Sequence, residues 1–177
     1  MAGFTLNGAA VAPAIEDDAA LLAALRGPLG LSGPRFGCGA EQCGACVVLV
    51  DGAPAYACTL PVAAVAGKRV ETLEGLGTPD APHPLQRAFL DLQAGQCGYC
   101  LSGILMASVA LLRRIPRPTE AQVRAALDPH LCRCGSHNRI VRAVLRAAEE
   151  MAAPRTSPSA SRPRAATTSR SCRVACM

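Results

Sequence analysis

Aromatic residues are scarce in this chain of 177 residues, which has no tryptophan, three phenylalanines and two tyrosines. Half of the residues are nevertheless hydrophobic, which excludes wholesale disorder. Alanine, valine and leucine must therefore fill the core, and such small side chains leave it thin for the length of the chain. We expect something besides apolar burial to help hold the fold.

Long hydrophobic segments are also missing. The first residues, MAGFTLNG, have neither a basic start nor a long apolar run, so we expect no secretory signal. The longest apolar stretch, Leu101 to Leu112, is too short for a membrane span and is interrupted by Ser102, Gly103 and Ser108. These features predict a cytoplasmic protein without a membrane span, in a compartment where thiols stay reduced.

The main part of the chain lacks net charge. Residues 1–153 hold 13 basic and 13 acidic side chains, so the five arginines of residues 154–177 supply the whole net charge of +5. A neutral body argues against nucleic acid as the main partner. Residues 154–177 show no periodicity and predict a disordered basic tail, in which Cys172 and Cys176 receive no role.

Motifs for nucleotide binding and nucleophilic catalysis are absent too. No Ser/His/Asp arrangement or phosphate loop is present, and Gly37-Cys38-Gly39 lacks the third glycine of a dinucleotide fingerprint. We therefore expect no catalytic residue and no flavin site in this chain.

The pattern of short strands predicts a small mixed sheet with one helix over residues 1–74. Asn7-Gly8 is typical of a tight hairpin turn, and Asp17 or Asp18 could cap a helix that Gly27 and Pro28 end. The expected strands are 4–6, 9–15, 47–50, 55–59 and 69–73.

Glycine and proline crowd residues 75–84, which predicts a linker. After it only helical periodicity appears, so residues 85–153 are expected to form a four-helix domain. Thr119 and Gln122 form a capping box. The group of Arg113, Arg114 and Arg117 at a helix end is expected to complement the helix dipole or face solvent, with a docking role as the alternative. His83, His130 and His137 are isolated and are interpreted as polar or capping residues. The expected helices are 85–93, 99–114, 119–127 and 136–151.

Four of the ten cysteines form a first group. Cys38, Cys43 and Cys46 follow the spacing C-x4-C-x2-C in a glycine-rich loop, and Cys58 follows after eleven residues. This is the spacing of plant-type ferredoxins, in which four cysteines hold a 2Fe–2S cluster. The small residues let backbone N–H groups point at the sulfurs. A structural zinc site is the alternative, although zinc sites usually show two C-x2-4-C pairs.

Four more cysteines form a second group. Cys97 and Cys100 open one predicted helix and, three residues apart, share a helix face; Cys132 and Cys134 lie in the turn before another helix. Helix N-termini offer free N–H groups and partial positive charge, which suits an anionic cluster. The group predicts a second 2Fe–2S site, with a zinc site or a thioredoxin-like redox pair as alternatives.

Both groups lie within a dense set of motifs that resembles the iron–sulfur subunit of the molybdenum hydroxylases, the xanthine dehydrogenase superfamily. The motifs cover residues 4 to about 151 and are FTLNG at 4–8, FGCGAEQCGAC at 36–46, VLVDG at 48–52, ETLEGLG at 71–77, HPLQ at 83–86, QCGYC at 96–100 and LCRCG at 131–135.

The resemblance implies an α+β protein: a β-grasp, plant-type ferredoxin domain followed by an all-α four-helix domain, each with one 2Fe–2S cluster. It implies that Gln96 and Cys134 contact the pterin of a molybdopterin cofactor in a separate large subunit. Electrons would pass from molybdenum to the cluster of the second group, from there to the cluster of the first group, and finally to an acceptor. The end near Cys43 would point toward that acceptor.

Finer motifs, RIPRPT at 114–119 and CRCGSH at 132–137, are similar to those of nicotinate and isoquinoline dehydrogenases. This similarity implies an N-heteroaromatic substrate such as nicotinate and a c-type cytochrome acceptor with haem, with an FAD-containing acceptor as the alternative. Three alternatives stay open: the same role in an aldehyde, carbon monoxide or purine oxidising complex, a self-contained ferredoxin, and a zinc-stabilised scaffold protein.

Overall fold

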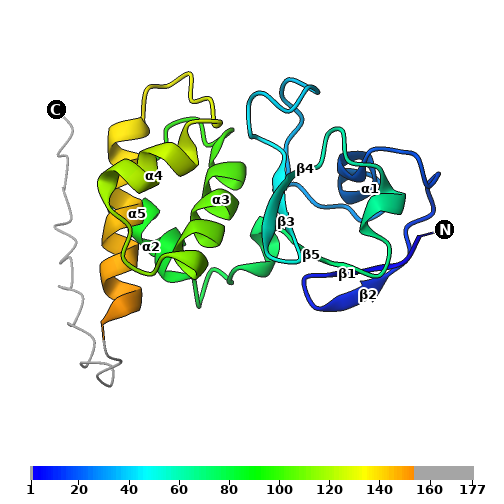
Figure 1. The fold of residues 1–177 in the computed structure, drawn as a ribbon, viewed down its shortest axis with the longest axis horizontal. Helices are drawn as coiled ribbons and strands as arrows, with labels where there is room; N and C mark the ends of the chain where they lie inside the picture. Colours follow the sequence, from blue (N-terminus) through cyan, green and yellow to red (C-terminus); the bar gives the residue numbers. More distant parts are fainter. Residues whose placement is uncertain (1, 154–177) are drawn as a thin grey trace, which may run out of the picture.

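The computed structural model describes residues 2–153; Met1 and residues 154–177, which include the predicted tail with Cys172 and Cys176, lie outside the described part. Figure 1 shows a sheet-containing half and a helical half side by side. Among residues 2–153, no helix has the length and apolar character needed to cross a membrane.

Five short strands form one mixed sheet in the order β2-β1-β5-β3-β4. The central pair β1 and β5 is parallel, and the other neighbours are antiparallel. Two-residue turns with positive φ at both positions, Asn7-Gly8 and Asp51-Gly52, close the two hairpins. The strands are β1 (Phe4–Leu6), β2 (Ala9–Val11), β3 (Val47–Val50), β4 (Ala53–Tyr56) and β5 (Arg69–Glu71).

One helix, α1 (Leu21–Arg26), joins β2 to β3 and buries its leucines against the sheet. Its N-cap is Ala20 without a side-chain cap, so the prediction of a cap by Asp17 or Asp18 was wrong. The Asp17 carboxylate instead accepts a hydrogen bond from the backbone N–H of Ala2 at 2.9 Å. The sheet order and this single covering helix confirm the β-grasp fold.

The helical half contains α2 (Pro84–Asp91), α3 (Leu101–Arg114), α4 (Glu120–Leu127) and α5 (His137–Ala152). The predicted capping box of Thr119 and Gln122 is confirmed at the start of α4. His83 caps α2 in the same way, because its Nδ1 accepts from the backbone N–H of Leu85. Two short 3-10 helices, η1 (Val62–Val65) and η2 (Leu73–Gly75), were not predicted.

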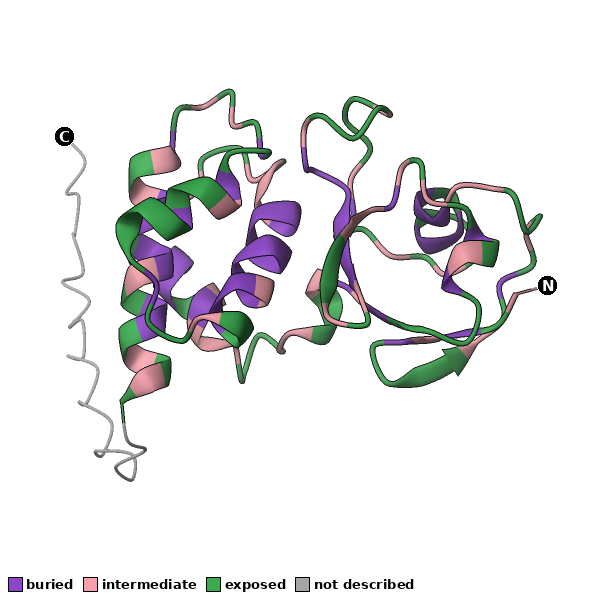
Figure 2. Ribbon diagram, in the orientation of Figure 1, coloured by how far each residue is buried: buried purple, intermediate pink, exposed green. Residues whose placement is uncertain are grey.

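Strand β3 is buried on both faces and connects the two halves. Val48 belongs to the core under α1, whereas Val47 and Leu49 belong to the core of the helical half, against α3. Figure 2 shows this buried strand between the two halves. Near the other end of the contact, Arg113 lies in the last turn of α3 and is half-exposed, as expected, and it also donates two hydrogen bonds to Glu71 of β5, a partner that was not predicted. The two halves therefore share a continuous apolar and ionic contact.

Candidate metal centres

The first cysteine group lies in the loop between α1 and β3, and Cys58 approaches it from just beyond β4. Figure 1 shows this loop at the same end of the molecule as the turns that hold the second group. Space inside the loop is limited, because a Cβ atom on Gly37 would lie 2.5 Å from the Cys43 sulfur. A glycine is therefore required where the chain passes the thiol.

Backbone N–H groups converge on the sulfurs of this loop, as the glycine-rich sequence predicts. Ala40 and Gln42 donate to Cys38 Sγ at 3.3 and 3.2 Å, and the N–H of Cys38 approaches Cys43 Sγ at 3.4 Å. The bonds from Ala40 and Gln42 lower the pKa of the Cys38 thiol to about 7. The loop thus favours the thiolate, which is the form that binds a metal.

Of the other two thiols of the first group, Cys46 is buried and Cys58 is half-buried. Cys46 is 2% exposed, and burial raises its pKa to about 12. The thiol of Cys58 lies near enough to that of Cys46, and the thiol of Cys43 near enough to that of Cys38, to affect the pKa values of Cys46 and Cys38. The four thiols therefore lie as two pairs, and a bound metal would supply the positive charge that keeps the buried Cys46 ionised.

The second group is built from the two turns that precede α3 and α5. Cys100 is the N-cap of α3, which begins at Leu101, so Cys97 lies outside the helix. The prediction that Cys97 and Cys100 share a helix face was wrong, because Gly98 has φ of +77° and turns the chain before the helix starts. Cys132 and Cys134 lie in the turn before α5, as predicted.

The thiols of the second group also lie in two pairs, Cys97 near Cys134 and Cys100 near Cys132. Burial raises the pKa of Cys100 to about 12. A hydrogen bond from the Tyr99 backbone is the largest of the causes that lower the pKa of the exposed Cys97. Like the first group, this group has one exposed thiol, which is Cys97, and its other three thiols are half-buried.

The donor sets fit two 2Fe–2S clusters. Each such cluster takes four cysteine thiolates, two on each iron, and each group offers four thiols in two pairs. Over residues 2–153, no set of three or more His, Cys, Asp or Glu side chains is arranged to hold a single metal ion.

Gln96, whose role was implied by resemblance, lies beside the second group. Its Nε2 donates to the carbonyl oxygen of Cys134 at 3.2 Å, and its side chain is exposed. The structure therefore brings Gln96 and Cys134 together at the surface, next to the exposed Cys97.

The two cysteine groups touch through the backbone. The N–H of Leu131 donates to the carbonyl oxygen of Cys43 at 3.1 Å, one residue before Cys132. The carbonyl oxygen of Cys43 therefore lies against the helical half. Cys38 is the exposed thiol of the first group.

Further contacts between the loops come from residues that the sequence analysis did not connect. The hydroxyl of Tyr99 donates to the carbonyl oxygen of Phe36, and Arg35 lies over the Tyr99 ring at 5.2 Å from its centroid. The ring of His130 is buried, and burial lowers its pKa to about 4, so the ring is neutral. No periodicity marks these positions, because each contact joins segments far apart in the sequence.

Two family models match this chain over most of its length: a 2Fe-2S iron-sulfur cluster binding domain over residues 4–69 and a 2Fe-2S binding domain over residues 72–145. The chain is also 51% identical over 149 residues to a nicotinate dehydrogenase subunit of Pseudomonas putida, with 84% of this chain and 95% of that protein aligned. The chain belongs to the iron–sulfur subunits of the molybdenum hydroxylase superfamily.

Other members of this superfamily agree with the assignment. The alpha subunit of isoquinoline 1-oxidoreductase from Brevundimonas diminuta is 48% identical over 153 residues, which cover 86% of this chain and all of that protein. The crystal structure of quinoline 2-oxidoreductase from Pseudomonas putida 86 superposes with a TM-score of 0.81 at 34% identity, over 85% of this chain and 94% of that chain.

Membership confirms three predictions. The protein is a subunit of an oxidoreductase, its fold is α+β, and it contains two 2Fe–2S-binding domains. The family models thereby decide between iron–sulfur clusters and the zinc alternative in favour of the clusters.

Proposed function

We propose that this iron–sulfur subunit transfers electrons from the molybdenum centre of a large molybdopterin-binding subunit to an external acceptor. The observation that supports this most strongly is the hydrogen bond from Leu131 to Cys43, which places the two cysteine groups against each other. Metals with a purely structural role would not require backbone contact between the two cysteine groups.

The proposed ligands of the first cluster are Cys38, Cys43, Cys46 and Cys58, and those of the second are Cys97, Cys100, Cys132 and Cys134. We propose that Cys38 and Cys43 share one iron of the first cluster and Cys46 and Cys58 the other. In the second cluster the proposed pairs are Cys97 with Cys134 and Cys100 with Cys132, thiols that lie near each other in the structure. We assign the first cluster to a domain of residues 1–74 and the second to a domain of residues 85–153, with residues 75–84 as the linker.

When bound, each cluster supplies a centre that gains and loses one electron at a time. The residues of the chain set the surroundings of that centre. The N–H groups of Ala40 and Gln42 stabilise negative charge on Cys38, and burial keeps water from Cys46. Hydrogen bonding and burial are the two means by which a protein tunes the potential of such a cluster.

The surface around Gln96, Cys97 and Cys134 is the proposed contact with the large subunit. Gln96 and Cys97 are exposed, and the hydrogen bond from Gln96 holds the Cys134 backbone at this surface. In this arrangement the pterin would approach Gln96 and Cys134, so electrons would enter at the second group and leave through the first. The end of the first group near Cys43 is then proposed to point toward the acceptor.

The proposed substrate is an N-heteroaromatic compound such as nicotinate, because the relatives with 51% and 48% identity belong to a nicotinate dehydrogenase and an isoquinoline oxidoreductase. The proposed acceptor is a c-type cytochrome with haem, and an FAD-containing subunit is the second candidate. We place the complex in the cytoplasm, where reducing conditions keep the eight ligand thiols available.

The test is purification of the native complex. We expect a red-brown protein with about four iron atoms and four acid-labile sulfides per chain, and two rhombic EPR signals on reduction. Substrate-dependent reduction of haem bands would support the cytochrome acceptor, whereas stoichiometric FAD without haem would support the flavin acceptor. Zinc in place of iron, or a single EPR signal, would overturn the proposed function.

A further inference from the structure

Residues 43–45 of the first cysteine loop are enclosed by the helical half, and His130 forms one side of the enclosure. We propose that His130 is a positioning residue, which holds this 43–45 segment against α3 and thereby fixes the separation of the two cluster sites. This inference rests on the proposed function and adds a residue to it that is no cluster ligand.

Each of the three residues in the 43–45 segment has its own contact with the helical half. The carbonyl oxygen of Cys43 accepts from the Leu131 N–H at 3.1 Å, and that of Ala45 accepts from the hydroxyl of Ser102 at 3.3 Å. Ser102 is 4% exposed and belongs to the first turn of α3. The segment is therefore attached at both of its ends.

Gly44, in the middle, is packed on two sides. A Cβ atom on Gly44 would lie 2.2 Å from Nδ1 of His130, so the imidazole ring lies directly against the glycine. On the other side, a Cβ atom on Gly103 would lie 1.8 Å from the Gly44 carbonyl oxygen. The Gly44 backbone is thus enclosed between the His130 ring and the backbone of α3, and neither side leaves room for movement.

Stability alone does not explain why a histidine occupies position 130. The residue is 4% exposed, and hydrogen bonding with the Gly44 backbone only partly offsets the lowering of its pKa by burial; Nδ1 has no partner at ordinary hydrogen-bond geometry within the described residues. A buried polar atom without a partner is unfavourable, and an apolar side chain would avoid that cost. The ring is flat and rigid, however, and these properties suit a side chain that supports a backbone segment.

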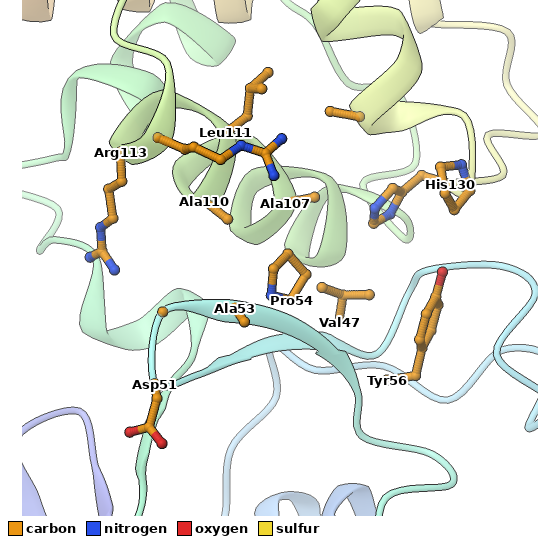
Figure 3. A pocket seen from close by; sticks show the side chains of 14 residues that line it. Val47, Asp51, Ala53, Pro54, Tyr56, Ala107, Ala110, Leu111, Arg113 and His130 are labelled. Atoms are coloured by element: carbon orange, nitrogen blue, oxygen red, sulfur yellow. The ribbon is translucent and has the colours of Figure 1, made fainter.

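His130 also lies beside a cleft. A cleft of about 670 Å³ lies between the β3–β4 hairpin and α3, and His130 lines it together with Tyr56 and Val47. Figure 3 shows His130 and Tyr56 at one end of this cleft and Asp51 and Arg113 at the other. Without the ring, the cleft would extend to Gly44, and the 43–45 segment would lose its support on that side.

A displacement here would matter for function because electron transfer between two centres slows steeply as their separation grows, and such sites must be held to within a fraction of an ångström. Cys43 and Cys132 are the proposed ligands on either side of the Leu131 bond. A looser 43–45 segment would therefore leave both clusters bound but change how strongly they interact.

The first test compares His130→Ala with Val123→Ala in the assembled complex. Val123 is fully buried in α4, away from the 43–45 segment, so it controls for a cavity in the same half. We expect both variants to keep their iron. Only His130→Ala should accelerate hydrogen exchange at the Leu131 amide, by about tenfold, and weaken the spin–spin interaction between the two reduced clusters in EPR.

The second test is a double-mutant cycle with Gly44→Ala. Alone, the added methyl group must displace the His130 ring, so exchange at Leu131 should increase; combined with His130→Ala, it should occupy the vacated space and restore part of the protection. Gly52→Ala is the control for backbone strain, since Gly52 has φ of +84° and open space around it. If His130→Ala alone loses iron, hydrogen exchange at the Leu131 amide in Gly44→Ala and in the double variant still tests the proposal.

The proposal is overturned if Leu131 exchange and the spin–spin interaction in His130→Ala equal those of Val123→Ala, or if the effects of Gly44→Ala and His130→Ala simply add. Failure of the proposed function gives a different result, because the wild-type complex would then lack the two interacting EPR signals. The two outcomes are therefore distinguishable in one set of samples.

Discussion

The carboxylate of Glu71 at the end of β5 accepts two hydrogen bonds from the guanidinium group of Arg113 in α3, at 2.9 and 2.7 Å. Paired geometry of this kind is the strongest form of ion pair between side chains. It joins the sheet-containing half to the helical half at the end of their contact that lies away from the cysteine loops, and it gives the first prediction.

Replacement of Glu71 by Gln is expected to lower the free energy of unfolding by roughly 0.5–1 kcal/mol at pH 7, a modest value because the pair is partly exposed. The hydrogen bonds from Arg113 lower the pKa of Glu71 in the folded protein. Its contribution is therefore complete above the pKa of the unfolded state, about 4.3, and is lost as the pH falls through the lower folded pKa.

Denaturant unfolding of wild type and Glu71→Gln, followed by circular dichroism, measures this difference. It should be constant from pH 7 to pH 5 and shrink only under more acidic conditions. Arg124→Leu is the control, because Arg124 pairs with Glu120 within one exposed helix turn and should cost less. A difference between wild type and Glu71→Gln that grows on acidification would contradict the assigned direction.

Much of this fold could be predicted because its signals are local. The capping box of Thr119 and Gln122, the Asn7-Gly8 turn and the C-x4-C-x2-C spacing each lie within a few residues, and the structure shows the first two where they were expected. Strand β4 begins earlier than predicted, at Ala53, because the two-residue turn Asp51-Gly52 pairs Val50 directly with Ala53. The weak β propensity of alanine and proline concealed that start.

What could not be predicted depends on contacts between distant segments. The pairing of Arg113 with Glu71 spans 42 residues, and no pattern in either segment specifies it. The same applies to His130 and Gly44, which meet only because α3 lies against β3. The helix start at Leu101 was misplaced because the conformation of Gly98, with positive φ, is decided by the cysteine group and not by helix periodicity.

A serine at position 134 is expected to disturb one cluster only. Because a hydroxyl group is a poorer ligand for iron than a thiolate, Cys134→Ser should change or abolish the EPR signal of the second cluster and leave that of the first unchanged. Cys58→Ser should give the opposite pattern.

EPR spectra of the reduced complexes make this comparison, and Cys172→Ala and Cys176→Ala serve as controls that should retain both signals. Loss of a signal in either control would show that the ligands have been assigned to the wrong cysteines.

Removal of iron is expected to destabilise the protein strongly. Cys46 is a buried thiol and Cys100 a half-buried one, and the binding energy of a metal at such sites adds to folding stability. With a thin core, loss of about 3 kcal/mol should lower the melting temperature by roughly 10 °C. Calorimetry before and after chelation measures the shift, and iron with sulfide, but not zinc, should reverse it; an unchanged melting temperature would contradict a stabilising role for the clusters.

Gln96→Ala should slow electron entry without removing a cluster. The Gln96 side chain donates to the Cys134 carbonyl oxygen at 3.2 Å and is not a proposed iron ligand. Its loss therefore removes a restraint on the Cys134 backbone while all four thiolates of the second group remain. We expect unchanged iron content, a shifted EPR signal for the second cluster only, and substrate-dependent reduction of that cluster slowed about tenfold or more, in the range typical of outer-shell partners of a metal site. Rapid-freeze EPR after mixing the complex with substrate measures the rate.

Gln42→Ala is the matched control, because only the backbone N–H of Gln42 contacts a cysteine and its side chain is exposed. Equal reduction rates in Gln96→Ala and Gln42→Ala would mean that electrons do not enter beside Gln96, and the proposed contact with the large subunit would have to be placed elsewhere.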